Sequence, residues 1–437
     1  MTTDTSPGTA NVTANVTANV TTNVAASNAG LLEGLRVVES SAFVAAPLGG
    51  MTLAQMGAEV IRVDTIGGGL DFHRWPVNDQ GNSFFWNGLN KGKKSVVADL
   101  RSPEARELIV ALATADGPGN GIFLSNFPAA GWLSDDRLRA HREDLIYVNI
   151  IGNPDGTTAV DYTVNPSSGF ALATGPIGYD RPTNHVLPAW DITTGMHAAL
   201  AVVGAERQRT RHGRGTFTTI SLADIAMAMV ANLGYLAQAQ MTTAERTSTG
   251  NDLYGAFGRD FPTADGRRIM VVAISLRQWQ SLVDATGIGA HLGGIEAALD
   301  VDLTQEGDRF EARDLIAAYV GPWVAKRTLA EVGEVFDEHG VCWGPYQTFR
   351  QLATDDWRCS TQNPLFHELH QPGIGDVLVP SSPILDQTTG PNPPAPAPLL
   401  GQHTVQVLAE VLGLSSAEIG GLLDRGLVAD AGQAQNS

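Results

Sequence analysis

Asp191 is the acidic residue of this sequence best placed to do chemistry. It follows the mostly apolar run His185–Trp190 and precedes Thr193–Gly195, where we expect a helix to begin. A carboxylate at the start of a helix lies near the positive end of the helix dipole, which favours its ionised, nucleophilic form. The residues alone favour a simpler role as the helix N-cap. Both roles stay open until more of the chain is considered.

The densest basic run is Lys91–Lys94, which reads Lys-Gly-Lys-Lys and has Arg101 nearby. Lysine charges around a flexible glycine suit the phosphates of a nucleotide diphosphate. A solvated turn before a strand is the competing interpretation. The loop Ser41–Pro47 is a second candidate anion site, because it consists mainly of small residues and precedes a helix whose first N–H groups would be free.

Several cofactor motifs do not occur in the sequence. No Gly-x-Gly-x-x-Gly fingerprint follows the first expected strand, and no Walker A or Gly-x-Ser-x-Gly motif is present. We interpret Gly67–Gly69 and Gly287–Gly289 as turns, which disfavours a nicotinamide or flavin enzyme. His367 and His370 form a His-x-x-His pair without a clear third ligand, so we expect two loop histidines and no metal site.

The composition is that of an acidic globular protein. The 437 residues are 43% hydrophobic and 17% charged, enough for two or three domains with a sizeable core. A net charge of −18 argues against nucleic-acid and anionic-membrane partners. The uncharged stretch Ser40–Ala58 contains proline and glycine, so we interpret it as a buried loop and helix and expect no membrane span.

The location follows from the cysteines and the first residues. Cys342 and Cys359 match no zinc spacing and cannot form a disulfide framework, which favours a reducing compartment. No basic segment followed by an apolar one opens the chain, so we predict a cytoplasmic protein. Residues 1–30 carry a repeated Ala-Asn-Val-Thr motif, and this polar segment is predicted to be a disordered tail.

Strands and helices alternate through the first half of the chain. Residues 35–39, 48–57 and 59–64 predict a strand, a helix and a second strand, a βαβ unit. Further strands are predicted at Ser95–Asp99, Gly121–Ser125, Leu145–Ile151 and Thr216–Ile220. Helices are predicted at Pro103–Ala113, Gly195–Gln208 and Leu222–Gln238. This alternation is typical of a doubly wound, mostly parallel α/β sheet.

A second α/β unit is predicted after the polar segment Thr242–Gly250. It contains the strand Arg268–Ile274 and three helical segments. The helices are predicted near Leu276–Ala285, Arg309–Tyr319 and Leu329–His339. Residues 391–398 are proline-rich and predicted to be extended, and Thr404–Leu412 predicts a closing amphipathic helix.

Taken together, the segments resemble the family III CoA-transferases, a family that also includes 2-methylacyl-CoA racemases. The resemblance runs from about Gly34 to Leu423, and its parts are individually weak but specific in their order and spacing. They are residues 34–39, 53–64, 89–96, 126–127, 213–215, 221–222 and 400–404. Where many members have Asn-Phe-Arg-Pro-Gly, this chain reads Asn126–Ala130 without the arginine.

The resemblance implies a role for Asp191 as the nucleophile that carries CoA as an aspartyl thioester. No cofactor would be bound permanently, because CoA is part of the acyl-CoA substrate, and no ATP is needed. Family members form interlocked homodimers, so the same assembly is implied here. The residues implied to contact CoA are Ala42, Val44, Ala45, Arg62, Lys91, Lys93, Lys94, Asn126 and Phe127.

Five further stretches resemble a branch of the family that moves CoA between the two carboxylates of one branched, unsaturated dicarboxylic acid. They are residues 41–50, 67–76, 161–166, 184–195 and 250–260. Intermolecular transfer between two acids is the near alternative, and a non-enzymatic CoA-binding module is a more distant one. The racemase branch needs a His–Asp pair where this chain has Val160–Asp161, which disfavours racemisation.

Arg74 and Arg259 are the candidate partners for a free substrate carboxylate, because guanidinium binds carboxylate through two parallel hydrogen bonds. Residues 250–258 are a candidate loop covering Asp191 against water, with a domain linker as the alternative. The expected organisation is a large CoA-binding domain over residues 31–240 and a small α/β domain over 241–345. Residues 346–430 would then return to the large domain.

Overall fold

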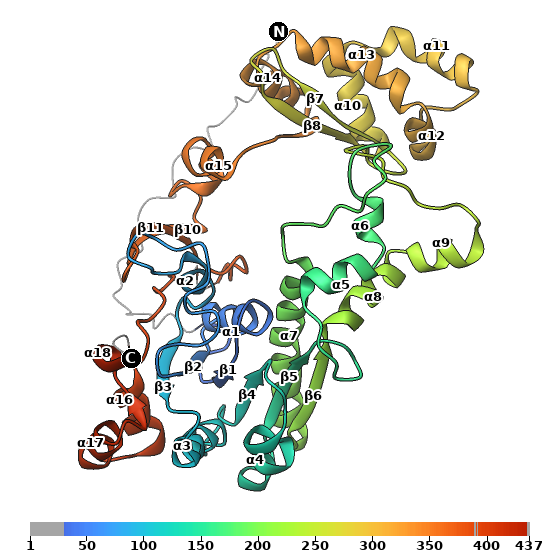
Figure 1. The fold of residues 1–437 in the computed structure, drawn as a ribbon. Coiled ribbons are helices and arrows are strands. Elements are labelled where there is room, and N and C mark those ends of the chain that lie inside the picture. Colours follow the sequence, from blue (N-terminus) through green and yellow to red (C-terminus); the bar gives the residue numbers. More distant parts are fainter. Residues whose placement is uncertain (1–29, 389, 391, 435–437) are drawn as a thin grey trace, which may run out of the picture.

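The computed structural model describes residues 30–388, 390 and 392–434 and contains two α/β parts joined by long connections (Figure 1). The larger part is built on a seven-stranded sheet with the order β12-β3-β2-β1-β4-β5-β6. Neighbouring strands from β3 to β6 are parallel, and β12 joins the edge antiparallel. A doubly wound α/β fold was therefore predicted correctly. The tail predicted for residues 1–30 lies almost entirely outside the described residues.

Six of the seven strands of the large sheet agree with the sequence prediction to within one or two residues, and β12 was not predicted. Apolar side chains of these strands pack against helices on both sides of the sheet, and a few charged residues of β1 and β2 are buried among them. The strands are β1 Arg36–Ser40, β2 Glu59–Thr65, β3 Lys94–Ala98, β4 Ile122–Ser125, β5 Ile146–Ile151, β6 Thr216–Ser221 and β12 Val428–Ala429. The helices of this part are α1 Ala45–Gln55, α2 Phe84–Leu89, α3 Pro103–Ala113, α4 Asp135–His141, α5 Asp161–Ser167, α6 Phe170–Ala173, α7 Ala189–His212, α8 Leu222–Asn232, α9 Tyr235–Met241, α16 Thr404–Leu412, α17 Ser416–Asp424 and α18 Ala431–Ala434.

The smaller part is a three-stranded antiparallel sheet with its own apolar core. Its strands are β7 Phe257–Pro262, β8 Arg268–Ala273 and β9 Cys342–Pro345, of which only β8 was predicted. Its helices are α10 Leu276–Thr286, α11 Gly289–Leu299, α12 Glu306–Glu311, α13 Arg313–Ala325 and α14 Leu329–His339. The single helix predicted at residues 309–319 is wrong in detail, because it divides between α12 and α13.

The chain returns from the small part to the large one through α15 Phe349–Asp355 and a two-stranded hairpin. The hairpin strands are β10 Phe366–Gln371 and β11 Gly375–Pro380, and they lie beside the region of α2 in Figure 1. His367 and His370 thus lie on a strand, where a loop was predicted, and His370 pairs with Asp376. The last segment adds β12, which pairs with β3, and then forms α18.

The predicted helix 222–238 is divided in two. Gly234 adopts a φ of 83° between α8 and α9, a left-handed conformation that suits glycine and ends the first helix. Within the described residues no single helix is long and apolar enough to cross a membrane. The α8–α9 pair passes that test of length and composition only as two segments bent by 62°.

The helices α1 and α7 cross at a contact that only glycine permits. A Cβ added to Gly195 would lie 2.6 Å from the carbonyl oxygen of Ala45, and one added to Gly49 would lie 2.9 Å from the carbonyl oxygen of Gly195. Such close backbone approach fixes the position of one helix on the other. As a result, the N-terminus of α1 and the first turn of α7, which contains Asp191, lie together beside the sheet (Figure 1).

We expect Gly195→Ala to lower the free energy of unfolding by about 1–3 kcal/mol, because the new methyl group meets backbone that cannot rotate away. Gly204→Ala is the matched control on the same helix. Gly204 is exposed, and an added Cβ there meets nothing within 4 Å, so this change should be neutral or stabilise by about 0.5–1 kcal/mol. Urea unfolding of both variants measures the difference. Equal stability of the two variants would contradict the proposed helix contact.

Candidate active site

The strand order places a crevice at the carboxyl ends of β1 and β4. The chain leaves β1 for β2 on one side and later returns to β4 on the other, so β1 and β4 flank the topological switch point where open α/β sheets bind ligands. Two hydrogen bonds join the loops at this point. The Ala42 N–H donates to Oδ1 of Asn126 at 3.0 Å, and the Asn126 amide donates back to the Ala42 carbonyl at 2.7 Å.

A small cavity of about 230 Å³ opens at the same edge of the sheet. Its wall is largely apolar and includes Phe127 beside the glycines that follow β2. The lining residues are Ser41, Val63, Asp64, Thr65, Gly68, Gly69, Leu70, Leu100 and Phe127. The resemblance predicted Asn126 and Phe127 as contacts for CoA, and the structure brings both of them to this crevice.

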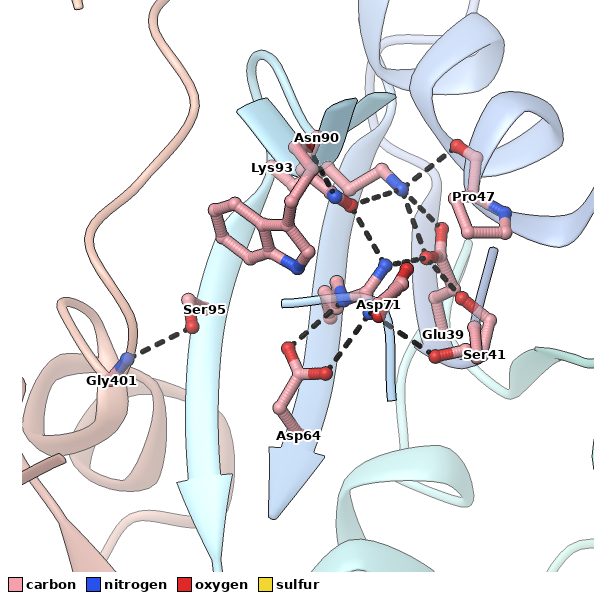
Figure 2. Close-up of polar contacts among 12 residues, drawn as sticks. Glu39, Ser41, Pro47, Asp64, Asp71, Asn90, Lys93, Ser95 and Gly401 are labelled. Atoms are coloured by element: carbon pink, nitrogen blue, oxygen red, sulfur yellow. Dashed lines mark hydrogen bonds and ion pairs between the residues drawn. The ribbon is translucent and has the colours of Figure 1, made fainter. Parts of the chain in front are cut away.

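A buried cluster of charges lies beneath the loop between β1 and α1 (Figure 2). The guanidinium of Arg62 donates to both oxygens of Asp64, at 2.9 and 3.0 Å, and to Asp71 at 2.9 Å. It also donates to the Ser41 carbonyl at 3.2 Å. Arg62 has no exposed surface, and its carboxylate neighbours raise the pKa of the guanidinium against the opposing effect of burial. The cluster therefore ties the loop to the sheet.

The backbone of that loop is strained at Phe43, whose φ is 67°. A bulky residue adopts this conformation only where surrounding contacts hold it. Here the Phe43 N–H donates to Oδ2 of Asp71 at 2.9 Å, and Asp71 is itself held by Arg62. The loop leads directly into α1, whose N-cap Val44 provides no side-chain cap. The first N–H groups of α1 thus lack intrahelical acceptors at the edge of the crevice.

Lys93 belongs to the same buried cluster. Its ammonium donates to Glu39, to the Pro47 carbonyl at 2.8 Å and to Asn90 at 2.9 Å, as Figure 2 shows. Burial lowers the pKa of Lys93 to about 8, although the Glu39 carboxylate opposes the change. Neither Arg62 nor Lys93 faces the crevice, so the structure gives them the task of holding the loop. A direct contact of either residue with CoA stays a prediction of the resemblance.

The remaining predicted basic residues are dispersed. Lys94 pairs with Glu59 and Glu410, and Arg259 on β7 pairs with Asp252 and Asp314. Lys91 donates to the Gly88 carbonyl, and burial lowers its pKa to about 8. In the described part of the chain Lys91 has no carboxylate partner. The run Lys91–Lys94 is therefore not a single phosphate cradle, because its side chains point to different neighbours.

Asp191 is the third residue of α7, since the helix begins at Ala189 and not near Gly195 as predicted. The N-cap role is taken by a distant residue. Oδ2 of Asp161, on α5, accepts from the N–H groups of Trp190 at 2.7 Å and of Asp191 at 3.1 Å. The Asp191 carboxylate itself has no hydrogen-bond donor among the described residues. Asp191 therefore does not cap its own helix, and its carboxylate is free to take part in chemistry.

The electrostatic surroundings of Asp191 are unusual for an aspartate. Burial and the nearby Asp161 carboxylate raise its pKa to about 7, while Arg74 acts to lower it. Arg74 lies with its guanidinium 5.4 Å from the ring centre of Phe43 and 5.1 Å from that of Phe85. Of the two predicted arginines, Arg74 is thus the one whose charge reaches Asp191. It has no carboxylate ion pair within the described residues.

Asp161 and His185 are site residues that sequence reasoning did not propose. Nε2 of His185 lies 2.7 Å from Oδ1 of Asp161, so Asp161 pairs with a histidine 24 residues further along the chain although position 160 is a valine. Val160 itself is exposed. The only signal in the sequence was that stretches 161–166 and 184–195 both took part in the family resemblance. Their contact depends on the fold.

The segment predicted to cover Asp191 is attached elsewhere in the structure. The Gly250 N–H donates to the Gly175 carbonyl at 3.1 Å, and Ser248 donates to the same carbonyl. These bonds join residues 248–250 to the loop that leads into α7. No hydrogen bond or ion pair joins residues 250–258 to Asp191 among the described residues, and the covering role stays a prediction.

The arrangement can support acyl transfer to a carboxylate. An unbonded carboxylate in the first turn of a helix, under the influence of one guanidinium, is suited to attack an electrophilic carbonyl. No group of three or more metal-ligating side chains is present among the described residues.

Comparisons with known proteins concern the family and the fold of the chain. A family model described as CoA-transferase family III matches residues 32–404. The sequence is 53% identical over 402 residues to the 2-methylfumaryl-CoA isomerase of Chloroflexus aurantiacus, covering 92% of this chain and 98% of that protein. It is 28% identical to the succinyl-CoA–D-citramalate CoA-transferase of the same organism, covering 89% and 96%. A solved CAIB/BAIF family protein from Brucella suis shares the fold with a TM-score of 0.70 at 24% identity, covering 87% of this chain and 99% of that one.

The raised pKa of Asp191 predicts a pH-dependent effect on stability. In the folded chain the carboxyl keeps its proton up to about pH 7, whereas in the unfolded chain it ionises near pH 4. Stability from this group is therefore full below about pH 4 and is lost as the pH rises through 7. We expect Asp191→Asn to raise the unfolding midpoint in urea more at pH 8 than at pH 4.5. An equal effect at both pH values would contradict the raised pKa.

Proposed function

This chain belongs to CoA-transferase family III and is an enzyme that moves CoA, and we propose that it transfers CoA between the C1 and C4 carboxylates of 2-methylfumarate (mesaconate). The observation that carries the proposal is the 53% identity, over nearly the full length of both proteins, to a protein named 2-methylfumaryl-CoA isomerase. The chemistry of such a reaction needs a nucleophile able to hold CoA for part of the cycle. Asp191 is our assignment for that nucleophile.

The transfer proceeds by exchange of acyl partners. The Asp191 carboxylate attacks the thioester carbonyl, a C–O bond forms, and the C–S bond breaks to leave a mixed anhydride and CoA thiolate. The thiolate then attacks the aspartyl carbonyl and releases the substrate carboxylate, leaving an Asp191–CoA thioester. The other carboxylate of the same acid attacks this thioester, and the same two steps in reverse yield the isomeric thioester. Thioester is exchanged for thioester, so the reaction consumes no ATP.

The CoA nucleotide end is assigned to the switch-point crevice. Its support is the set of free N–H groups at the start of α1, together with the apolar cavity beside Phe127. Ala42, Val44 and Ala45 line that helix start, and Asn126 joins it from the opposite strand. Lys91 and Lys94 stay contacts implied by the family resemblance alone, because they lie at the amino end of β3, away from this crevice. No resident cofactor is proposed, because CoA arrives as part of the substrate.

Arg74 is assigned to the free carboxylate of the substrate. Its guanidinium is exposed, unpaired with any described carboxylate and close enough to Asp191 to influence its ionisation. Arg259 is a weaker candidate, since two aspartates already occupy its guanidinium. In an acidic protein, an arginine beside the nucleophile and without a carboxylate partner is suited to hold an acid that must turn over within the site.

We also propose a homodimer that acts in the cytoplasm. Large apolar side chains are strongly exposed on the isolated chain, among them Trp75, Val186 and Phe349 with exposed fractions of 80%, 88% and 90%. Surfaces of this kind are typical of interfaces between subunits. Both cysteines are free, which is compatible with a reducing compartment.

Intermolecular transfer is the second candidate, because another relative is named for transfer between succinyl-CoA and D-citramalate. The two reactions are separated by supplying the C1 thioester of mesaconate together with isotopically labelled free mesaconate. We expect the C4 thioester to form without label, since donor and acceptor are one molecule. Chromatography with mass detection measures both products. Label in the thioester pool, or turnover only with a second acid, would replace the isomerase assignment with an intermolecular transferase.

Asp191→Ala should abolish turnover, and Asp191→Glu should retain at most a small fraction, because the longer side chain displaces the carboxylate from the helix start. In the wild type the rate should fall as the pH drops through about 7, since the protonated carboxyl is no longer a nucleophile. A wild-type protein quenched during turnover should carry CoA on the peptide containing Asp191. Turnover by Asp191→Ala at the wild-type rate would refute the assignment of the nucleophile.

A further inference from the structure

Asp161 is a buried carboxylate with both oxygens engaged. Oδ1 lies 2.7 Å from Nε2 of His185, and Oδ2 accepts the N–H groups of Trp190 and Asp191. One side chain on α5 therefore joins the segment before α7 to the first turn of α7 itself. Asp161 is 1% exposed, so it is reached by no ligand directly and can act only through the groups that it holds.

Resting on the proposed function, we propose that Asp161, held in place by His185, is a positioning residue that sets the reactivity of the Asp191 carboxylate. The geometry provides two routes. The carboxylate fixes the helix turn on which Asp191 stands, and it brings a second negative charge next to the nucleophile. Its Oδ2 lies 3.1 Å from the backbone nitrogen of Asp191.

In the first route, Asp161 occupies the N–H groups at the N-terminus of α7. The N–H groups that would stabilise an ionised Asp191 are already bonded to Asp161, so Asp191 gains less from the end of the helix. A carboxylate that lacks donors and faces a like charge is more basic than an ordinary aspartate. Within one class of nucleophile, higher basicity gives faster attack on a carbonyl as long as the group remains ionised.

The second route is the negative charge of Asp161 next to Asp191, and His185 fixes the orientation of that carboxylate. With Nε2 facing a carboxylate, the imidazole carries its proton on that nitrogen and donates to Oδ1. The segment around it is held as well. The backbone N–H of His185 donates to Oδ1 of Asn184, which is bonded to Asn165, and Trp190 donates through its indole to Asn165 at 3.1 Å. Asp161 is thus held by His185 at one oxygen and by the first turn of α7 at the other.

The charged and titratable groups around Asp191 come from several elements. Helix α5 contributes Asp161 and Tyr162, whose hydroxyl donates to the Val186 carbonyl. The segment before α7 contributes His185, and the segment after β2 contributes Arg74. On α7 itself, one ring nitrogen of His197 lies 2.8 Å from the Thr193 carbonyl. Among the described residues, Asp161 is the negatively charged neighbour that raises the pKa of Asp191.

Asp161→Asn tests the charge separately from the hydrogen bonds. The amide oxygen can still accept from the first turn of α7, but the negative charge is gone. We expect the acid limb of the pH–rate profile to move down by about one pH unit. The rate on the high-pH plateau should fall about 3-fold, for a Brønsted slope of about 0.5 as found for thiolates. A purely structural role would lower stability and leave the position of the limb unchanged.

His185→Ala and His185→Gln form the matched pair for orientation. The alanine variant leaves Asp161 free to turn away, so kcat should fall while the KM for the acyl-CoA changes little. The glutamine Nε2 can replace the imidazole donor to Asp161, so this variant should regain most of the activity lost in the alanine variant. Equal loss in both variants would overturn the positioning role of His185.

The outcomes also separate this inference from the proposed function. The wild type and Asp191→Ala are assayed first with the mesaconyl C1 thioester at each pH. An inactive wild type overturns the proposed function and the inference together. An active wild type whose acid limb does not move in Asp161→Asn overturns the inference alone. A shifted limb together with rescue by glutamine supports it.

Discussion

The fully buried charge cluster around Arg62 is the constraint on which the site depends. Placing a guanidinium and an ammonium in the interior is unfavourable unless each meets carboxylates and carbonyls, and here Glu39, Asp64 and Asp71 provide them. Removing one member of such a cluster typically costs about 3–5 kcal/mol, because its partners stay buried without compensation. Through Asp71 the same cluster holds Phe43 in a strained conformation and so fixes the loop that opens the crevice. The same contacts therefore stabilise the fold and fix the geometry of the site.

The contact of α1 with α7 carries that constraint across to the nucleophile. Gly49 and Gly195 let the two helices approach at backbone distance, so the loop fixed by Arg62 and the turn that holds Asp191 cannot move independently. The two helix N-termini have different tasks. That of α1 is left without a side-chain cap and faces the crevice, whereas that of α7 is capped by Asp161. One end is available for an anionic ligand, and the other is used to position a residue.

The sequence predicted the large sheet well because its strands are buried on both faces and alternate with helices, a pattern visible in a single chain. Asp191 emerged only through resemblance, since local residues favoured a cap. The true cap, Asp161, lies 30 positions earlier, and no local pattern can show such a contact. Arg62 and Lys93 differ from Asp191: the resemblance implied that both contact CoA, and only the fold shows that carboxylates surround them. The small strands β7 and β9 were missed because they contain proline and glycine.

Charge is conserved through the proposed cycle. Before transfer, the two negative charges at the site are on Asp191 and on the free carboxylate of the thioester. After transfer, Asp191 is a neutral thioester and the released acid carries both charges. Arg74 can therefore hold the same substrate carboxylate in both states. The attraction is strongest at the moment when the acid is free, which keeps the acid in the site while its second carboxylate turns toward the thioester. An enzyme that exchanges two different acids has the opposite need, because the first acid must leave before the second can enter. A nucleophile whose pKa is near 7 serves the retained acid well, since it is ionised for attack and yet basic enough to react.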